Sequence, residues 1–507
     1  MSWVVGNSLS VQTTSGKLLG TQEDGLVVFR GVPYASPPTG ALRWMPPQAL
    51  EPSRRVKGAY NFGPICPQNL MPAGALPRQS FPEEPQAEDC LLLNVWTPKP
   101  DNERRAVMVW IHGGGFTNGS GSSPMHPAGN LSKRGQIVLV TVNYRLGALG
   151  FLNLDQVTSG KIPASGNEGL LDQIAALRWV HDNIKAFGGD PDNVTVFGES
   201  AGAMSIGCLL AMPAARGLFR KAILESGSNT CRQLPDAVAV AEKYLSALGA
   251  SGKDPDALRA QPVPALLSAQ QRLMQMGVRG AAMEPVIDGK VLPQLPLDAI
   301  KAGSARDVTV LAGGNLNEGT LFGMMDPGLA KLDEAGLAAR VAQMVPADRA
   351  AGLIRTYRTA LAKRGTAPTP ADIHMAIQGD KMFRVPNVRL VELQREHGVP
   401  AFSYVFDWKC AVPGLGACHA LDVGFVFGST FKDFHGAGEA VERLAAQMQD
   451  AWIAFAKTGD PSTAALPWPA YGPERKTMVL GERSRVESAP YEAERAAWDG
   501  LDNRFLG

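Results

Sequence analysis

Residues 106–197 alternate short apolar runs with helical text, and this alternation restricts the possible folds more than any other feature of the sequence. The apolar runs lie at 106–111, 137–142 and 194–197, and an amphipathic helix is predicted near 169–187. Strands that are apolar along their whole length are typical of parallel sheets buried on both faces, with helices as the connections. The sequence therefore predicts an α/β fold whose central, mostly parallel sheet is covered by helices on both faces.

Helical periodicity also dominates residues 235–377, where alanine is frequent and a short β-forming run at 308–311 interrupts it. We find no fixed-period repeat, low-complexity tract or linker rich in glycine and serine that would separate modules. The 507 residues are enough to bury a large core. We therefore expect one domain over residues 1–507, with a mainly helical insertion at about 235–377.

Ser200 lies in Gly198-Glu-Ser-Ala-Gly202, directly after the predicted strand that ends at Phe197 and before the next helical run. A sharp turn from strand to helix strains the serine and exposes its hydroxyl, while glycines two residues to either side leave room for the neighbouring backbone. The pentapeptide alone occurs by chance in many proteins, but its place between strand and helix resembles the nucleophile elbow of α/β-hydrolases. Ser200 is the predicted nucleophile.

A glycine-rich loop, His112-Gly-Gly-Gly-Phe116, follows another predicted buried strand. A tetrahedral intermediate carries negative charge on the former carbonyl oxygen, and backbone N–H groups on a loop without side chains can approach it closely. The alternative is a flexible glycine turn, which is common, yet the loop and the elbow occur together in the order typical of α/β-hydrolases. Gly114, Gly115 and Ala201 are the predicted oxyanion-hole donors.

A serine hydroxyl becomes an effective nucleophile when a base takes its proton, so this chemistry requires a histidine and an acid that orients it. His419 lies in a loop after the predicted strand 402–406, where the base is expected. The other histidines after Ser200 fall in helical text or follow no strand: His374, His397 and His435. His419 is the predicted general base.

Glu318, in Gly313-Gly-Asn-Leu-Asn-Glu-Gly319, follows a predicted strand at the carboxyl edge of the sheet, where active sites of such folds gather. A solvated loop glutamate is the alternative, and Asp288 or Asp326 would then compete for the role. Both of these aspartates resemble turn residues, since one precedes glycine and the other precedes proline. Glu318 is the predicted acid.

Further segments carry a resemblance to a known family. They are Phe29-Arg-Gly-Val-Pro-Tyr-Ala35, Leu42-Arg-Trp44, Glu88-Asp-Cys-Leu-Leu-Leu-Asn94, Asn143-Tyr-Arg145, Asn183-Ile-Lys-Ala-Phe-Gly-Gly-Asp-Pro191 and Asp422-Val-Gly-Phe-Val-Phe-Gly428. Together with the motifs above, they make nearly the whole chain resemble the type-B carboxylesterases, which include para-nitrobenzyl esterases and are related to cholinesterases. The resemblance implies the α/β-hydrolase fold, with helical insertions that form the pocket walls, and the triad of Ser200, Glu318 and His419.

The resemblance also implies positions that support the site. Arg43 with Glu88, and Arg145 with Asp172, correspond to structural ion pairs. Ser226, in Glu225-Ser-Gly227, matches a family serine buried near the nucleophile, and Asn317 stands where the family usually has aspartate. Cys66 and Cys90 match the ends of a disulfide-closed loop in secreted relatives, and Cys410 and Cys418 are an additional pair beside His419, for which packing is expected rather than a bridge.

The substrate expectation follows from the aromatic residues. The segment 67–89 contains five prolines and no tryptophan, whereas cholinesterases place a tryptophan in that loop to bind a quaternary ammonium group. With 7% aromatic residues overall, we expect an aliphatic and methionine-lined pocket for short to medium acyl or aryl carboxylic esters. Amides, carbamates and lactones are the alternative substrates of the same triad, and a non-catalytic binding module is disfavoured because all three triad residues are present.

Charge and cysteine spacing exclude other classes. The net charge of +1 gives no field that would attract nucleic acid or an anionic membrane. None of the six cysteines forms a C-x-x-C pair, so neither a metal nor any other cofactor is expected. No secretory pattern and no apolar run of about 18 residues occurs, which favours a cytoplasmic protein without a membrane span. The sequence does not distinguish a monomer from a homodimer.

Overall fold

The computed structural model describes residues 9–69, 84–275, 283–365 and 367–507. The chain forms two compact units, and β10 (Lys221–Glu225) carries it from one to the other. Of the described residues, unit 1 comprises 9–69, 84–222, 231–275 and 283–294, and unit 2 comprises 223–230, 295–365 and 367–507. The single domain over residues 1–507 stays a prediction, and the helices of its expected insertion are divided between the two units.

Within the part of the chain that the structure describes, no helix combines the length and the apolar character needed to cross a membrane.

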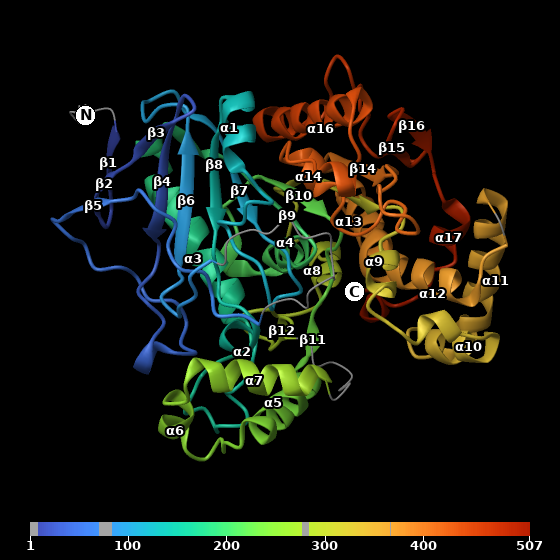
Figure 1. Cartoon of the computed structure of the whole chain (residues 1–507), viewed down its shortest axis with the longest axis horizontal. Coiled ribbons are helices and arrows are strands. Elements are labelled where there is room, and N and C mark those ends of the chain that lie inside the picture. The colour runs from blue at the N-terminus through green and yellow to red at the C-terminus, as the bar shows by residue number, and fades with distance from the viewer. Residues whose placement is uncertain (1–8, 70–83, 276–282, 366) are drawn as a thin grey trace. The chain divides into compact units, whose positions relative to one another are not determined.

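The strands of unit 1 form a sheet in the order β9-β7-β8-β6-β4-β3 (Figure 1). Their bounds are β3 (Thr21–Glu23), β4 (Leu26–Pro33), β6 (Leu92–Thr97), β7 (Arg105–Ile111), β8 (Val138–Val142) and β9 (Gly189–Glu199). β7 pairs in parallel with β8 and β9, whereas β6, β4 and β3 are antiparallel to their neighbours. β6 and β8 are buried along their whole length, as expected for apolar strands covered on both faces. The strands predicted within residues 106–197 are confirmed.

The helices that pack on this sheet are α1 (Ala128–Gly135), α3 (Glu168–Asn183) and α4 (Ala201–Ala211). The side chain of Glu168 accepts the backbone N–H groups of Ser165 at 2.8 Å and Gly166 at 3.1 Å, which fixes the start of α3. A 3-10 turn, η3 (Ile184–Phe187), follows α3 and ends at Gly188, whose φ of 81° suits glycine. The helix predicted near 169–187 is therefore confirmed.

The remaining elements of unit 1 form its edges and a helical region. They are β1 (Ser10–Thr13), β2 (Gly16–Leu19), η2 (Gly40–Leu42), β5 (Val56–Gly58), α2 (Gly147–Gly150), η4 (Pro213–Ala215), β11 (Arg232–Gln233), α5 (Leu234–Leu248), α6 (Pro255–Arg259), α7 (Val263–Gln275) and β12 (Val286–Ile287). α5 and α7 pack on each other, and their lengths lie side by side in Figure 1.

Two ion pairs connect distant segments of unit 1. The guanidinium of Arg145 forms two hydrogen bonds with the carboxylate of Asp172, at 2.7 and 2.8 Å, and both side chains are buried. Arg43 binds Glu88 in the same two-pronged manner, at 2.5 and 2.6 Å. Removing one partner of such a pair would leave a buried charge uncompensated, so the pairs hold their segments in register. Both predicted ion pairs are confirmed.

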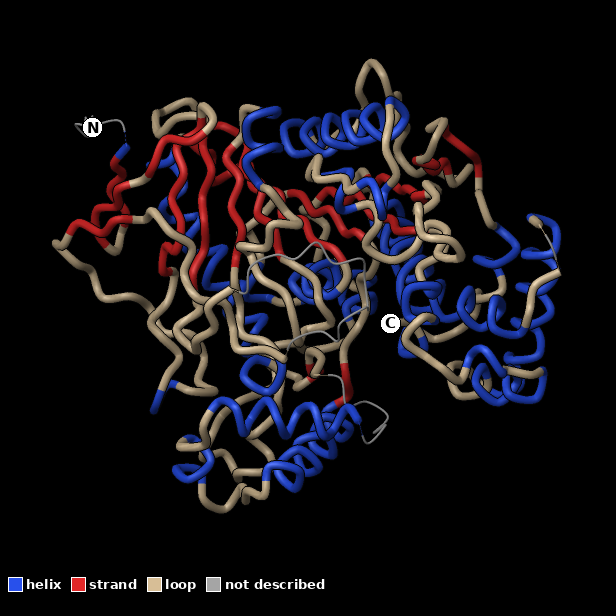
Figure 2. The backbone as a smooth tube through the Cα atoms, in the orientation of Figure 1, coloured by secondary structure: helices blue, strands red, loops and turns tan. Residues whose placement is uncertain are grey.

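The strands of unit 2 follow the order β16-β15-β14-β13-β10, and β13, β14 and β15 are parallel. The helices that cover them include α13, which packs on β13 and β14, and α16, which packs on α14. Helices without an intervening strand make up the stretch from α9 to α13 (Figure 2). The elements are α8 (Pro296–Lys301), β13 (Thr309–Asn315), α9 (Gly319–Gly323), η5 (Leu329–Lys331), α10 (Glu334–Val341), α11 (Ala347–Arg364), α12 (Pro370–Gly379), η6 (Asp380–Arg384, a π-helical turn), α13 (Val385–Glu396), β14 (Ala401–Phe406), α14 (Val423–Val426), α15 (Lys432–His435), α16 (Glu439–Thr458), β15 (Lys476–Leu480), β16 (Arg485–Ser488), α17 (Glu492–Ala496) and η7 (Asn503–Phe505).

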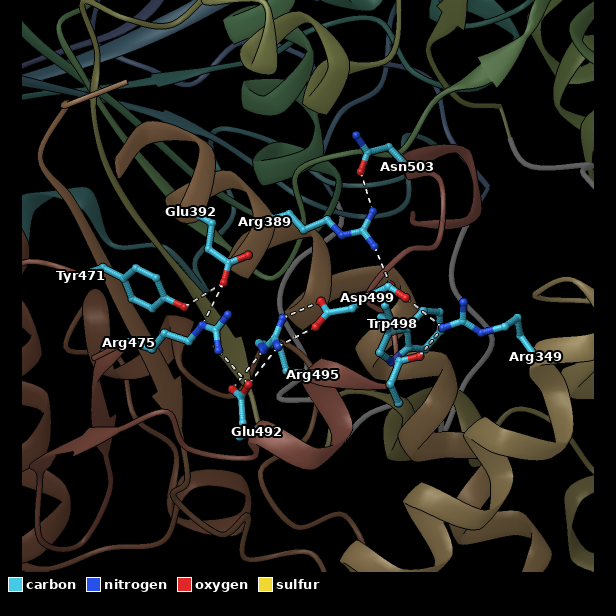
Figure 3. Close-up of polar contacts among 11 residues, drawn as sticks. Arg349, Arg389, Glu392, Tyr471, Arg475, Glu492, Arg495, Trp498, Asp499 and Asn503 are labelled. Carbon is cyan, nitrogen blue, oxygen red and sulfur yellow. Dashed lines mark hydrogen bonds and ion pairs between the residues drawn. The ribbon is translucent and has the colours of Figure 1, made fainter. Parts of the chain in front are cut away.

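A network of charged side chains fixes the C-terminal segment of unit 2 (Figure 3). Arg475 bridges Glu392 of α13 at 3.1 Å and Glu492 of α17 at 2.7 Å. Arg495 lies between Glu492 at 2.8 Å and Asp499 at 2.7 Å. Each arginine is shared by two acids, so the network stabilises the position of α17 better than isolated surface pairs would.

Candidate active site

The turn between β9 and α4 holds Ser200 in a strained conformation, with φ 54° and ψ −124°. Left-handed φ values are uncommon for residues other than glycine and mark turns under strain. A Cβ atom at Gly202 would lie 2.0 Å from the carbonyl oxygen of Ile111, and one at Gly198 would lie 2.6 Å from it. Gly198 and Gly202 are therefore required, because the end of β7 lies too close to the turn to leave room for a Cβ atom at either position. The sequence pattern predicts glycine at both positions for this reason.

The loop His112-Gly-Gly-Gly-Phe116 lies against this turn. A Cβ atom at Gly113 would come within 3.1 Å of the Cβ of Ser200 and 2.8 Å of the Glu199 carbonyl oxygen. Gly114 and Gly115 have φ of 108° and 61°, which only glycine adopts without strain. Unit 1 thus brings together two motifs that are far apart in the sequence.

Ala201 is the first residue of α4. The N–H groups of a first helical turn have no acceptor within the helix, and the helix dipole makes this end attractive to negative charge. The predicted oxyanion donors Gly114, Gly115 and Ala201 consequently belong to two segments that meet at Ser200.

His112, the first residue of the glycine loop, holds the start of that loop in place through its own contacts. Its ring stacks on Tyr144 with 4.4 Å between centroids, and its Nδ1–H donates to the Gly113 carbonyl at 2.8 Å. The Tyr144 hydroxyl donates to the His112 carbonyl at 2.7 Å. Burial lowers the pKa of His112 to about 4, so the imidazole is neutral near pH 7 and serves as a packed hydrogen-bond donor.

We expect the protein to lose stability as the pH falls from 6.5 towards 4, in part because of His112. The unfolded chain binds a proton at this histidine with its ordinary pKa of 6.5, whereas the folded chain resists protonation until about pH 4. Stability from this group is therefore present above pH 6.5 and is lost as the pH falls, by roughly 3 kcal/mol in total. Urea unfolding of the wild type and of His112→Gln at about pH 7.5 and about pH 4.5 measures this loss. An identical pH-dependent loss in both proteins would contradict the assignment.

In unit 2, Glu318 and His419 form a direct pair. The Nδ1–H of His419 donates to Oε2 of Glu318 at 2.6 Å, and the two side chains are 6% and 2% exposed, respectively. Because Nδ1 carries this proton, Nε2 is the ring atom that can accept another. The geometry is that of a histidine base oriented by a buried carboxylate.

The other oxygen of Glu318 is equally well held. Oε1 accepts the hydroxyl proton of Ser226 at 2.5 Å and the backbone N–H of Asn315 at 2.6 Å. A Cβ atom at Gly314 would lie 2.7 Å from Oε1, so glycine there leaves the space that the carboxylate occupies. Charge-assisted hydrogen bonds of this kind hold the carboxylate in one orientation. Ser226 thus lies in contact with Glu318.

Asn317 binds the loop that carries the histidine. Its backbone N–H donates to the Ala417 carbonyl at 2.8 Å, and its side-chain oxygen accepts the Ala417 N–H at 3.0 Å. The hydroxyl of Thr320 donates to the carbonyl of Leu415 at 2.6 Å. The segments of Glu318 and His419 are therefore tied together on both sides of the acid. The hydrogen bond from the Ala417 N–H needs only an uncharged oxygen as its acceptor. Asparagine can therefore stand at position 317 in place of aspartate.

Two phenylalanine rings pack on His419. The Phe383 ring centroid lies 4.5 Å and the Phe322 ring centroid 5.1 Å from that of the imidazole. Phe383 belongs to the π-helical turn η6, and a Cβ atom at the preceding Gly379 would lie 3.0 Å from the Cβ of Glu318. The two rings therefore restrict the rotation of the imidazole.

Asp422 forms a second buried carboxylate network that the sequence interpretation did not assign. Its Oδ1 accepts a hydrogen bond from the side-chain amide of Asn315 at 3.0 Å, and its Oδ2 accepts the hydroxyl of Tyr404 at 2.9 Å. Burial raises the pKa of Asp422 to about 6, and the nearby Glu318 charge adds to the shift. Its position three residues after His419, in a motif of the resemblance, was the available signal.

The competing residues lie in structural positions. Asp288 accepts three backbone N–H groups of its own turn, at 2.9 to 3.0 Å, and Asp326 pairs with Arg340 at 2.5 Å. The other histidines are elsewhere: His374 in α12, His397 at the end of α13 and His435 in α15. These contacts fit turn, helix and packing roles for all of them.

The candidate residues are divided between the units. Unit 1 holds Ser200, Gly114, Gly115 and Ala201, and unit 2 holds Glu318, His419 and Ser226. Among the residues that the structure describes, no cluster of three or more His, Cys, Asp or Glu side chains could hold a metal ion. Of the proline-rich segment 67–89, residues 70–83 lie outside the described residues.

Comparison with known proteins relates the whole chain to esterases. A family model described as the carboxylesterase family matches residues 7–498. Para-nitrobenzyl esterase of Bacillus subtilis is 40% identical over 497 residues, covering 96% of this chain and 97% of that protein. Phenmedipham hydrolase of Pseudarthrobacter oxydans is 34% identical, covering 93% of this chain and 94% of that protein. The similarity therefore extends along almost the whole length of each protein.

Solved structures of esterases are also similar to this chain. A crystal structure of a Geobacillus stearothermophilus carboxylesterase at pH 6.2 matches with a TM-score of 0.86 and 38% identity, covering 97% of this chain and 100% of that chain. A PNB esterase structure matches with a TM-score of 0.85 and 38% identity, covering the same shares of the two chains. Both the backbone arrangement and the sequence are thus similar over the full comparison.

Proposed function

Because this chain belongs to the carboxylesterase family, and is a carboxylic ester hydrolase with the α/β-hydrolase fold, we propose that Ser200, Glu318 and His419 are its catalytic residues. Gly114, Gly115 and Ala201 are the oxyanion donors in this proposal, and Ser226 holds Glu318. The observation that carries it is the contact of the glycine loop with the strained turn at Ser200. The Glu318–His419 hydrogen bond of 2.6 Å is the second support.

The proposed reaction begins at Ser200. Nε2 of His419 takes the hydroxyl proton while Oγ attacks the ester carbonyl carbon. The oxyanion that forms accepts hydrogen bonds from the N–H groups of the glycine loop and of Ala201, which stabilise it more than they stabilise the planar ester. His419 then gives its proton to the leaving alcohol, and an acyl-enzyme remains on Ser200.

Hydrolysis of the acyl-enzyme repeats these steps with water. His419 takes a proton from water as the oxygen attacks the acyl carbon, and returns it to Ser200 as the carboxylic acid leaves. Glu318 stabilises the imidazolium in both halves of the reaction and keeps Nδ1 protonated. This cycle consumes one ester and one water and needs no cofactor.

We propose aryl esters with short or medium acyl chains as substrates. The Bacillus subtilis relative is named for para-nitrobenzyl esters. In unit 2, Met324 and Met325 follow α9, the helix that begins after Glu318, and they are 59% and 50% exposed. Methionine side chains adapt to irregular apolar ligands. Such flexible apolar groups near the acid are consistent with a pocket that accepts aryl groups.

We further propose that the enzyme acts on small neutral esters in the cytoplasm. The net charge of +1 provides no attraction for nucleic acid. Cys66 and Cys90 are free thiols, which suits a reducing compartment.

Hydrolysis of para-nitrophenyl acetate, butyrate and octanoate tests the substrate proposal. We expect kcat/KM to be highest for acetate or butyrate and about tenfold lower for octanoate, because one pocket discriminates chain length by a few kcal/mol at most. Para-nitroacetanilide, the amide with the same aryl group, should react far more slowly than the acetate. Faster hydrolysis of the amide would contradict the ester assignment, and a preference for octanoate would contradict the short pocket. Labelling with a fluorophosphonate, followed by peptide mass analysis, should place the adduct on the peptide that contains Ser200.

A further inference from the structure

The side-chain amide of Asn315 lies between two groups of unit 2 that are far from it in the sequence. Asn315 is the last residue of β13, and it is 1% exposed. Its Nδ2 donates to Oδ1 of Asp422 at 3.0 Å and to Oγ of Ser226 at 3.4 Å. Both protons of the amide nitrogen are therefore directed at buried acceptors, and one of these acceptors contacts Glu318.

We propose that Asn315 is a positioning residue, whose side-chain amide directs the hydroxyl of Ser226 toward Glu318. Asp422 holds this amide in one orientation. The result is a carboxylate that stays in line with His419, while Asn315 itself takes no part in the proton transfers. This inference rests on the proposed catalytic role of Glu318.

The hydroxyl of Ser226 has one proton, and the amide of Asn315 decides where that proton points. Oγ of Ser226 accepts an N–H from Asn315, so its own proton is donated in another direction. It goes to Oε1 of Glu318 at 2.5 Å. Such a charge-assisted hydrogen bond holds the carboxylate in one plane. The other oxygen of Glu318, Oε2, thereby stays directed at Nδ1 of His419, 2.6 Å away.

Asp422 determines which way the Asn315 amide faces. An ionised carboxylate accepts hydrogen bonds and donates none, so it selects the amide nitrogen and excludes the amide oxygen. Oδ1 of Asn315 is buried and has no hydrogen-bond partner among the residues that the structure describes. With the amide turned over, Oδ1 would face the Ser226 hydroxyl and draw its proton away from Glu318.

The carboxylate of Asp422 is fixed from its other side by Tyr404. Its Oδ2 accepts the Tyr404 hydroxyl at 2.9 Å. Tyr404 belongs to β14, which pairs with β13 in parallel, and its ring fills the space where Gly313 lacks a Cβ atom. The series of hydrogen bonds thus starts on the sheet and ends at Glu318, with Asn315 in the middle.

The experiment isolates the side chain of Asn315 from its backbone. The backbone N–H donates to Oε1 of Glu318 at 2.6 Å, and Asn315→Leu keeps this bond while removing the amide. The assay measures kcat and KM for para-nitrophenyl butyrate, per active site counted with a fluorophosphonate. Burial raises the pKa of Asp422 to about 6, so a buffer of about pH 8 keeps it ionised.

We expect Asn315→Leu to lower kcat by about 10- to 100-fold, because a small displacement of an orienting group has an effect of this size. KM should stay within about twofold of the wild-type value, since substrate binding does not depend on this amide. A merely structural role would lower thermal stability and leave kcat per active site unchanged, and that result would overturn the inference.

Gln394→Met is the matched control on the same unit. Gln394 is also fully buried, and its Nε2 donates to the carbonyls of Ala305 and Val308 at 2.9 and 2.7 Å, just before β13. Its amide oxygen also lacks a hydrogen-bond partner among the described residues. Its loss removes two similar hydrogen bonds away from Glu318, so stability should fall while kcat per active site stays unchanged.

A double-mutant cycle separates this inference from the catalytic proposal. If Asn315 acts through Glu318, Asn315→Leu should have almost no further effect on kcat in a Glu318→Gln background. An equal fall in both backgrounds would overturn the inference. Full activity of Glu318→Gln would instead overturn the catalytic role of Glu318.

Asp422→Asn tests the same series of hydrogen bonds from its other end, and it preserves the shape of the side chain if Asn315→Leu does not fold. An asparagine at this position can donate to Oδ1 of Asn315, so the amide is no longer held in one orientation. We expect kcat to fall about tenfold, with no further fall in the Glu318→Gln background. A folded Asp422→Asn enzyme with the wild-type kcat would overturn the inference.

Discussion

Replacing Ser200 with alanine is expected to lower kcat for para-nitrophenyl butyrate by about 10⁵- to 10⁶-fold. The substitution removes the attacking oxygen and retains the Cβ atom, so the strained turn at φ 54° needs no rearrangement. The oxyanion donors and the binding pocket stay, and their residual catalysis sets the lower limit of the rate. Initial rates, together with circular dichroism and thermal unfolding of the same preparation, measure the effect.

Ser205→Ala is the matched control for this variant. Ser205 is a buried serine on the same helix, α4, and its hydroxyl accepts a hydrogen bond from the side-chain amide of Gln173 at 3.1 Å. Its loss should cost about 1 kcal/mol of stability and leave kcat nearly unchanged. Substantial turnover by a folded Ser200→Ala protein would show that another residue is the nucleophile.

Glu318→Gln is expected to lower kcat by about 10³- to 10⁴-fold through the tautomer of His419. Oε1 of Glu318 accepts two donors, Ser226 at 2.5 Å and the Asn315 N–H at 2.6 Å. The single oxygen of a glutamine stays with these donors, so its NH₂ group faces Nδ1 of His419. The imidazole then places its proton on Nε2, where it cannot accept the proton of Ser200.

Asp326→Asn is the corresponding control, because Asp326 is the alternative acid of the same unit. Its ion pair with Arg340, at 2.5 Å, lies near the surface, so we expect a change of at most about 1 kcal/mol in stability. The kcat should match that of the wild type. If kcat fell in Asp326→Asn and stayed unchanged in Glu318→Gln, Asp326 and not Glu318 would be the catalytic acid. The pH dependence of kcat in Glu318→Gln is a second measure, since the neutral partner no longer stabilises the imidazolium.

The parts of the fold that the sequence predicts well depend on local chemistry. The apolar runs that became β7, β8 and β9 are identifiable because burial on both faces permits only apolar side chains. Gly198 and Gly202 are identifiable because the turn at Ser200 cannot accommodate a Cβ atom on either side. The α/β-hydrolase fold and the carboxylesterase family are both confirmed by the comparisons.

Other features had no local signature. Phe383 reaches His419 from a π-helical turn, although the two residues are far apart in the chain. Asp422 and Asn315 form their hydrogen bond through the meeting of a strand end and a loop. Asp422 lies in a motif of the family resemblance, but the motif does not show that Asn315 is its partner. Such contacts depend on which segments pack together, and single-sequence patterns do not record that choice.

By itself, the sequence of this protein determined where strands alternate with helices, where the chain must turn sharply and which residue types could carry acyl transfer. These properties arise from backbone geometry and side-chain size within a few residues. Only the tertiary structure decided that Glu318 binds His419 and that Ser226 and Asn315 complete the hydrogen bonds of Glu318. The physical reason is that the pKa, orientation and reactivity of a side chain are set by the groups packed around it, and folding brings those groups from distant parts of the chain.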